Sequence, residues 1–166
     1  GVPASLLSVS SPAGSLIYGF GETLSIELSF DRPVQVTAGL QNYLTLSNGK
    51  KALYSSGSGS NVLTFEYTIQ SDDKTPNVTV DSIYSSGIKG VSNGLIDTQS
   101  FQSFTSALGN GQVVDFDASP SIISIDILEG NGSFVLGDLL TLEVKFDQAV
   151  SLTGDLSLEP ILALNN

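Results

Sequence analysis

The chain has 166 residues and a net charge of −11, with six lysines and arginines and no cysteine, methionine, tryptophan or histidine. A surface this acidic repels phosphate groups, so the composition argues against nucleic acids and anionic membranes as partners and favours cations. Without cysteine or histidine, a disulfide scaffold, a typical zinc centre and a histidine-based nucleophilic triad are excluded within this sequence.

One stretch of the sequence occurs twice. TLSIELSFDRPVQVT occupies residues 23–37 and LTLEVKFDQAVSLT occupies residues 140–153, so that Asp147 follows Asp31 by 116 residues. In both copies apolar side chains alternate with polar ones, which is the period of a β-strand with one buried face. A repeat at a fixed offset predicts tandem modules, each built on this core strand.

Shorter strands are expected on either side of the first copy. Pro12 interrupts the first strand, which residues 16–20 are expected to continue. Pro33 is expected to end the repeated strand because proline has no N–H to donate to a sheet. Asn48-Gly49 predicts a tight hairpin turn, and SSGSGS at residues 55–60 predicts a flexible loop. The expected strands are residues 6–10, 16–20, 23–31, 34–37, 43–46, 52–54, 63–69, 78–80 and 113–116.

Residues 101–108 are ambiguous. Phe101, Phe104 and Leu108 have helical spacing, but the surrounding serine, threonine and glutamine favour an irregular strand. Residues 117–120, DASP, form the expected linker.

Short strands with frequent turn signals predict an all-β fold, a β-sandwich with Greek-key connections. Residues 1–117 are expected to form one complete Ig-like module, and residues 118–166 the N-terminal part of a second copy. LTLSN at residues 44–48 reappears as LALNN at residues 162–166, and the second copy has no equivalent of residues 49–118. The second module is therefore expected to be incomplete.

Several short motifs occur in a fixed order. They are Y-x-x-G-E at residues 18–22, F-D-x-P-V-x-V-T at residues 30–37, A-x-Y-x-S-G-S-G-S at residues 52–60 and L-T-F-x-Y-T at residues 63–68. Together they resemble the bacterial Ig-like repeats of very large secreted adhesins, over most of residues 6–108 and again over residues 122–166. The resemblance implies sandwiches strung in series on a cell surface, often stiffened by calcium. The chain departs from the family in two places, with SDD at residues 71–73 instead of a Gly-Asp turn and LIDT at residues 95–98 instead of an Asp-rich Gly-Asn ending.

Carboxylates are the candidate metal ligands. In a seven-stranded sandwich the first and last strands run the same way, so several turns share the end that faces the linker. Oxygen ligands converging there would suit Ca²⁺, which accepts six to eight of them. The alternative is that these are solvated turn residues, since aspartate bonds readily to its local backbone; Asp31, at the module's free end, is assigned to this class. The candidate ligands are Glu22, Asp72, Asp73, Asp115, Asp117 and Asp147.

The sequence therefore predicts a non-enzymatic, extracellular structural spacer or adhesive segment of a larger cell-surface protein, whose partners are neighbouring modules. No pair of carboxylates is fixed as a glycosidase requires, and no stretch of about 20 apolar residues suggests membrane insertion. Two alternatives remain open. One is a carbohydrate-binding module that uses Tyr43 and Tyr54, whereas Tyr67 is assigned to the core. The other is a self-assembling fibre subunit whose partial module is completed by strands from a neighbouring chain.

Overall fold

The computed structural model describes residues 1–12, 16–104, 108, 113–130 and 132–152. The chain divides into two compact units, Gly1–Ser119 and Pro120–Asn166, where the sequence placed the boundary after residue 117. The similarity between residues 44–48 and 162–166 concerns a segment outside the described residues.

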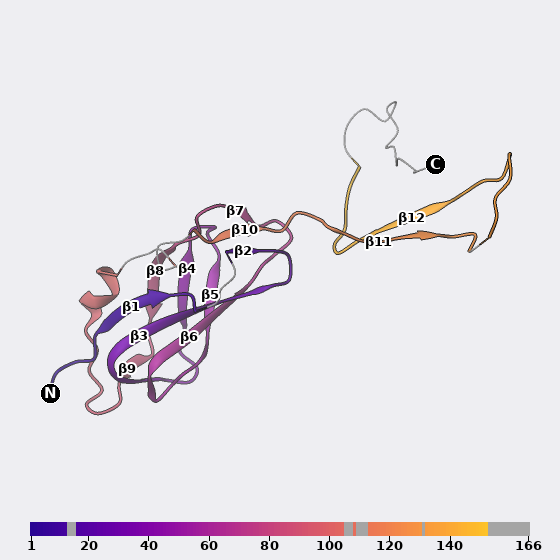
Figure 1. Ribbon diagram of the computed structural model, residues 1–166. Coiled ribbons are helices and arrows are strands. Elements are labelled where there is room, and N and C mark those ends of the chain that lie inside the picture. The colour runs from indigo at the N-terminus through magenta and orange to yellow at the C-terminus, as the bar shows by residue number, and fades with distance from the viewer. Residues whose placement is uncertain (13–15, 105–107, 109–112, 131, 153–166) are drawn as a thin grey trace. The chain divides into compact units, whose positions relative to one another are not determined.

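The first unit is dominated by a seven-stranded antiparallel sheet (Figure 1). Its strands follow the order β1-β3-β6-β5-β4-β8, and β9 pairs with the far part of the long strand β3. The bounds are β1 Leu6–Ser10, β3 Thr23–Val36, β4 Asn42–Leu46, β5 Lys51–Ser56, β6 Ser60–Thr68, β8 Val80–Ser85 and β9 Ile88–Gly90.

A three-stranded sheet completes the first unit. It consists of β2 (Ile17–Tyr18), β10 (Asp115–Asp117) and β7 (Lys74–Thr75), which are labelled together in Figure 1. The central strand β10 runs parallel to β2 and antiparallel to β7. Residues 16–20 therefore do not extend the first strand within its own sheet but contribute a short strand to another sheet.

The two sheets of the first unit share one apolar core. Phe116 of β10 stacks on Tyr67 of β6 with ring centroids 5.5 Å apart, and meets the edge of Tyr18 at 6.4 Å. Each fully buried large apolar side chain contributes roughly 1.5–3 kcal/mol to folding. The predicted all-β class and both predicted core strands are confirmed, since these alternating side chains are buried: Leu24, Ile26, Leu28 and Phe30 of β3, and Leu63, Phe65 and Tyr67 of β6.

Pro33 does not end the core strand, which continues as β3 to Val36. The pairing of β3 with β6 shifts register between Ser29 and Val34, and from Val34 onward β3 also pairs with β9. Pro33 lies in this irregular stretch, where its missing N–H interrupts no regular ladder, while its carbonyl accepts the Val91 N–H at 3.0 Å.

The predicted loop at residues 55–60 is shorter than expected. Strand β5 extends to Ser56 and β6 begins at Ser60, which leaves a turn of three residues. Gly57 and Gly59 adopt φ values of +107° and +92°, a conformation that favours glycine. The Ser60 hydroxyl donates to the carbonyl of Gly57, so the serine and glycine content here specifies a hairpin turn.

The expected irregular strand around Phe101 is wrong. Residues Thr98–Gln102 form a 3₁₀ helix, η1, whose N-cap Asp97 accepts the N–H of Gln99 with its side chain. An aspartate at this position satisfies a donor that a helix start leaves unpaired. Phe101 is buried edge-on against Phe30, so a single helical turn is enough to place it in the core.

The described part of the second unit is an antiparallel hairpin of β11 (Ile122–Ile127) and β12 (Leu142–Phe146). Ile122 pairs with Phe146 as Leu6 pairs with Phe30, 116 residues earlier. The register also shifts at the same place in both strand pairs, between Leu6 and Ser8 in the first unit and between Ile122 and Ser124 in the second. The register of the repeated element is thus the same in both copies.

Candidate functional site

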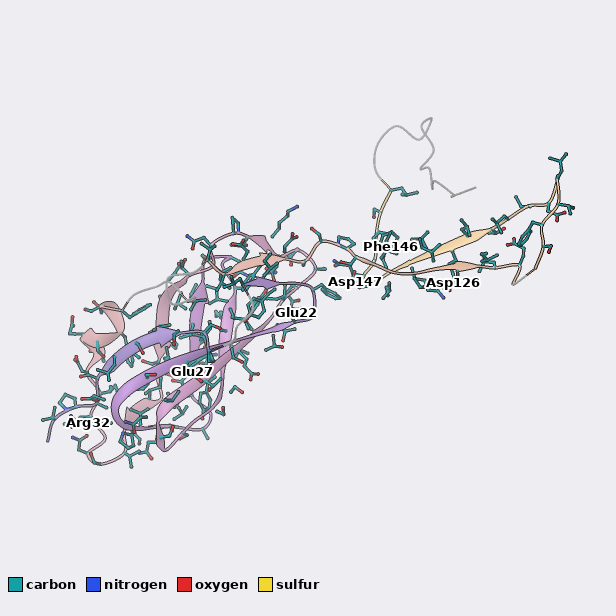
Figure 2. The ribbon with its side chains drawn as sticks, viewed as in Figure 1. Glu22, Glu27, Arg32, Asp126, Phe146 and Asp147 are labelled. Carbon is teal, nitrogen blue, oxygen red and sulfur yellow. The ribbon has the colours of Figure 1, made fainter. Side chains whose placement is uncertain are left out.

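The predicted metal-site carboxylates of the first unit lie in or next to the strands of the three-stranded sheet. Glu22 follows β2, Asp72 and Asp73 precede β7, and Asp115 and Asp117 are the ends of β10. Figure 2 shows Glu22, just before β3, and Arg32, in the second half of β3, at opposite ends of the unit, so Glu22 and Asp31 belong to different ends. The side chains of this set differ greatly in their surroundings.

Asp73 is the buried centre of a hydrogen-bond network. Its residue is 3% exposed, and its carboxylate accepts from the Tyr67 hydroxyl, the Gln70 N–H, the Asn48 side-chain amide and the Lys50 ammonium. Burial alone would raise the pKa of Asp73, but these donors outweigh it and hold the pKa below its ordinary value. The carboxylate is thus fully used by protein donors.

This network joins segments that are distant in the sequence. Asn48 and Lys50 belong to the turn between β4 and β5, Tyr67 belongs to β6, and the backbone carbonyl of Asp73 accepts the Ala118 N–H at 2.9 Å. Burial, followed by the hydrogen bond to Asp73, raises the pKa of Tyr67 to about 12. The Asp73 carboxylate therefore joins the hairpin turn to a core strand, and the backbone carbonyl of the same residue holds the segment after β10.

Asp72, next in sequence to Asp73, is surface-exposed. Its side chain is 75% exposed and forms an ion pair with Lys50, whose pKa is raised chiefly by this contact. The Lys50 ammonium lies between the two aspartates and also contacts Asp73 at 3.3 Å. An exposed pair of this kind contributes little to stability.

The remaining carboxylates of the set bond to nearby backbone. Glu22 accepts the N–H of Gly19 at 3.3 Å, Asp115 that of Asn77 at 2.8 Å, and Asp117 that of Ser119 at 3.2 Å. The Ser119 hydroxyl and N–H lower the pKa of Asp117. Glu22 and Asp117 therefore make short-range bonds of the kind expected of turn residues.

Asp147 and Asp31 make the same pair of contacts in the two units. The Asp31 carboxylate accepts the Ser5 N–H at 2.9 Å while the Asp31 N–H donates to the Ser5 carbonyl at 3.0 Å. Asp147 makes the equivalent bonds with Ser121 at 2.9 and 3.1 Å. Figure 2 shows Asp147 beside Phe146, where β12 ends. Each aspartate closes the end of its strand pair.

Within the described parts of the chain, no group of three or more His, Cys, Asp or Glu side chains lies close enough together to hold a metal ion. None of the described residues forms a helix with the length and hydropathy needed to cross a bilayer. Calcium binding therefore stays a prediction that only a binding measurement tests.

The tyrosines have two different environments. Tyr67 is buried in the core, as predicted, and Tyr54 lies edge-on to Phe65. Tyr43 lies on the outer face of β4 and stacks on Tyr84 of β8, with ring centroids 4.8 Å apart and an interplanar angle of 15°. Sequence reasoning had not joined these two rings, because only long-range strand pairing places them opposite each other.

Lys51 was also missed by sequence reasoning. Its ammonium lies 4.1 Å from the centroid of the Tyr43 ring, in cation–π contact. The predicted hairpin at Asn48-Gly49 could have indicated this contact, because the hairpin pairs β5 with β4 and so brings Lys51 close to Tyr43.

Comparison with known proteins yields no match: no protein-family model, curated protein or solved structure corresponds to this chain. Function must therefore be argued from the chain's own residues.

Proposed function

We propose that this chain is a segment of an extracellular surface protein built from tandem Ig-like β-sandwich modules, and that it acts as a non-catalytic spacer or adhesive segment. The observation that carries the proposal is the closure of both strand pairs by Asp31 with Ser5 and by Asp147 with Ser121. Two units that share a register, a register shift and a closing aspartate are most simply explained as copies of one module.

A repeated turn adds to this support. The N–H of Glu22 donates to the Gly19 carbonyl and the Glu22 carboxylate accepts the Gly19 N–H. Asp138 and Val135 make the same two bonds 116 residues later. The intervening glycine has a positive φ in both turns, +79° at Gly21 and +100° at Gly137.

The strand order of the first unit favours the Ig-like class. β3 is hydrogen-bonded to β6 and β4 to β8, so the chain crosses between non-consecutive strands as Greek-key connections require. The parallel pairing of β2 with β10 brings an early strand beside the last one of the unit. Residues near the two ends of the unit are thereby joined by backbone hydrogen bonds.

Stiffness and reach are the proposed mechanism. In series, each module adds its own length, and the linker sets the angle between modules. Force applied along such a chain would have to shear strands that carry the core, in particular β3 against β6, which pair from Thr23 to Val34. A spacer of this kind needs resistance to unfolding and no catalytic residue.

Single-molecule stretching of the full chain tests this mechanism. We expect the first unit, Gly1–Ser119, to open in one event that releases roughly 400 Å of extended chain. Gradual extension at low force, without a discrete event, would contradict a role in resisting mechanical force.

Calcium belongs to the proposal as a stiffening ion of the first unit. Its candidate ligands there are Glu22, Asp72, Asp115 and Asp117, because protein donors already occupy the Asp73 carboxylate. Thermal unfolding in millimolar calcium and in excess chelator measures it, because a ligand of the native state raises the melting temperature. We expect Asp115→Asn to reduce any calcium-dependent rise, because among the described residues its carboxylate accepts a hydrogen bond from the Asn77 N–H and forms no ion pair. Equal melting temperatures in both buffers would contradict calcium binding and would assign these carboxylates to solvated turns.

A fibre subunit is the second candidate function, and one observation favours it. Ile122 and Ile125 of β11 are 58% and 48% exposed, whereas their counterparts in the first unit, Leu6 and Val9, are 8% and 6% exposed. An uncovered apolar strand face invites strands from a neighbouring chain. Sedimentation over a range of concentrations tests this. Assembly that Ile125→Asp abolishes would support it, and a monomer at every concentration would contradict it.

A further inference from the structure

A pocket of about 470 Å³ opens on the first unit beside strand β5. One wall is the segment 36–43, which runs from the last residue of β3 through the connecting loop into β4, and the other is formed by Lys51, Leu53 and Tyr54. The volume lies within the range of roughly 300–1,000 Å³ that is typical of small-molecule sites. The spacer mechanism makes no use of this pocket.

Hydrogen bonds hold the walls in place. The Thr37 N–H donates to the Gly87 carbonyl at 2.8 Å, and the Gly87 N–H donates to the Asn42 side-chain oxygen at 3.0 Å. The Asn42 amide in turn donates to the Leu40 carbonyl at 3.2 Å. On the opposite wall, the Tyr54 hydroxyl accepts the N–H of a turn residue. A preformed pocket loses little conformational freedom when a ligand enters it.

The rim of the pocket exposes apolar side chains that no core packing explains. Leu40 is 50% exposed and Leu53 is 59% exposed. Leu53 lies directly opposite Tyr43 in the sheet, and Tyr43 lies opposite Tyr84, which is 48% exposed. Three adjacent strands therefore present one apolar and aromatic row beside the opening.

Lys51 gives the pocket a local positive charge. None of the residues that line the pocket is acidic, although the chain carries a net charge of −11. Among the described residues Lys51 forms no ion pair, whereas its neighbour Lys50 contacts two aspartates. The Tyr43 ring holds the Lys51 ammonium at the pocket, 4.1 Å from the ring centroid. The chemistry that complements these walls is an anion with a partly apolar body.

We propose that this pocket binds a carboxylate-bearing sugar unit of an acidic polysaccharide. The sugar carboxylate pairs with the Lys51 ammonium, and the C–H face of the ring packs against Leu53, which lies on the same face of β5 as Lys51. The sugar hydroxyls bond to polar groups of the 36–43 wall, such as the side chain of the exposed Gln41. The inference adds a ligand to the proposed spacer and does not depend on that function, because it rests on the first unit alone.

Titration of the full chain with trigalacturonate, followed by ¹H–¹⁵N NMR, tests the proposal. We expect binding with a Kd of roughly 1 mM, and shift changes confined to residues 36–43 and 51–54. Because an exposed ion pair contributes up to about 1 kcal/mol, Lys51→Gln is expected to weaken binding by up to about fivefold. Lys51→Arg should retain binding. Lys89→Gln, which removes an exposed lysine of β9, is the matched control and should leave the affinity unchanged.

Competing ligands are separated by two further probes. Maltotriose carries the sugar rings without the carboxylates, and triglutamate carries carboxylates without sugar. Preference for trigalacturonate over both supports the proposal. Equal affinity for maltotriose would show that Lys51 does not recognise the sugar carboxylate, which contradicts the proposal. Equal affinity for triglutamate would also contradict it and would assign the pocket to acidic peptides. No shift changes at about 10 mM trigalacturonate, or binding that Lys51→Gln leaves intact, would overturn the proposal.

Discussion

Replacing Asp73 by alanine should destabilise the first unit more than any other single carboxylate change. The substitution leaves the buried Tyr67 hydroxyl, the Gln70 N–H and the Asn48 amide without their shared acceptor. A hydrogen bond to a charged group contributes about 1.5–3 kcal/mol, and stranding the partners of a buried charge costs about 3–5 kcal/mol in total. That is a large part of a typical stability of roughly 5–15 kcal/mol.

Urea denaturation followed by tyrosine fluorescence is the suitable assay. The chain has no tryptophan, and all five tyrosines lie in the first unit, so the signal reports on that unit alone. With a slope of roughly 2 kcal/mol per molar urea, the expected loss lowers the midpoint by about 2 M.

Asp72→Ala is the matched control because it removes the adjacent carboxylate, which is largely exposed. Its ion pair with Lys50 should contribute less than about 1 kcal/mol. If Asp73→Ala and Asp72→Ala shift the midpoint equally, the network around Asp73 does not stabilise the unit and the argument from burial is wrong.

Three further results are expected. Because folding raises the pKa of Tyr67 from 10.0 to about 12, the first unit should lose roughly 2–3 kcal/mol of its free energy of unfolding as the pH rises from about 10 to about 12. Urea midpoints measured across this pH range should show the loss, and Tyr67→Phe should remove it. Gly57→Ala should cost well over 1 kcal/mol in the same assay, because its Cβ would lie 2.1 Å from the Val62 carbonyl, whereas Gly59→Ala has only its φ of +92° to strain. Phe101→Ala should cost about 3–5 kcal/mol in urea if η1 places this ring in the core, and under 1 kcal/mol would contradict that placement.

Alternation of apolar and polar residues made the core strands predictable. In β3 and β6 the period of two extends over several residues, and one buried face is enough to produce it. The hairpin at Asn48-Gly49 was predictable for a local reason as well: Gly49 has a φ of +80°, and the Asn48 side chain accepts the Lys50 N–H. Both signals are contained within a few neighbouring residues.

The roles of Asp72 and Asp73 could not be separated from the sequence. The two are adjacent and chemically identical, yet the side chain of one is 75% exposed and that of the other is 2% exposed. What distinguishes them is the position of Tyr67 and Asn48, which depends on how β6 and the β4–β5 turn pack. Only tertiary structure decides which aspartate is buried.

The shared role of Asp31 and Asp147 could have been predicted from the sequence repeat. Asp31 was assigned to a turn and Asp147 to a metal site, although the repeat places them at equivalent positions. Both bond to the serine that precedes the first strand of their unit. Equivalent positions in a repeat predict equivalent local contacts, so one assignment should have been applied to both.

The closing aspartate also bears on how the first strand pair of each unit reaches its register. Each aspartate bonds to a serine 26 residues earlier, so the contact lies within the first strand pair. In the first unit the apolar face of this pair is buried in the core, whereas Ile122 and Ile125 of the second unit are exposed in the described structure. The same register occurs in both settings. The register of the pair is therefore determined by the two strands and their closing aspartate, and it does not depend on burial of the apolar face.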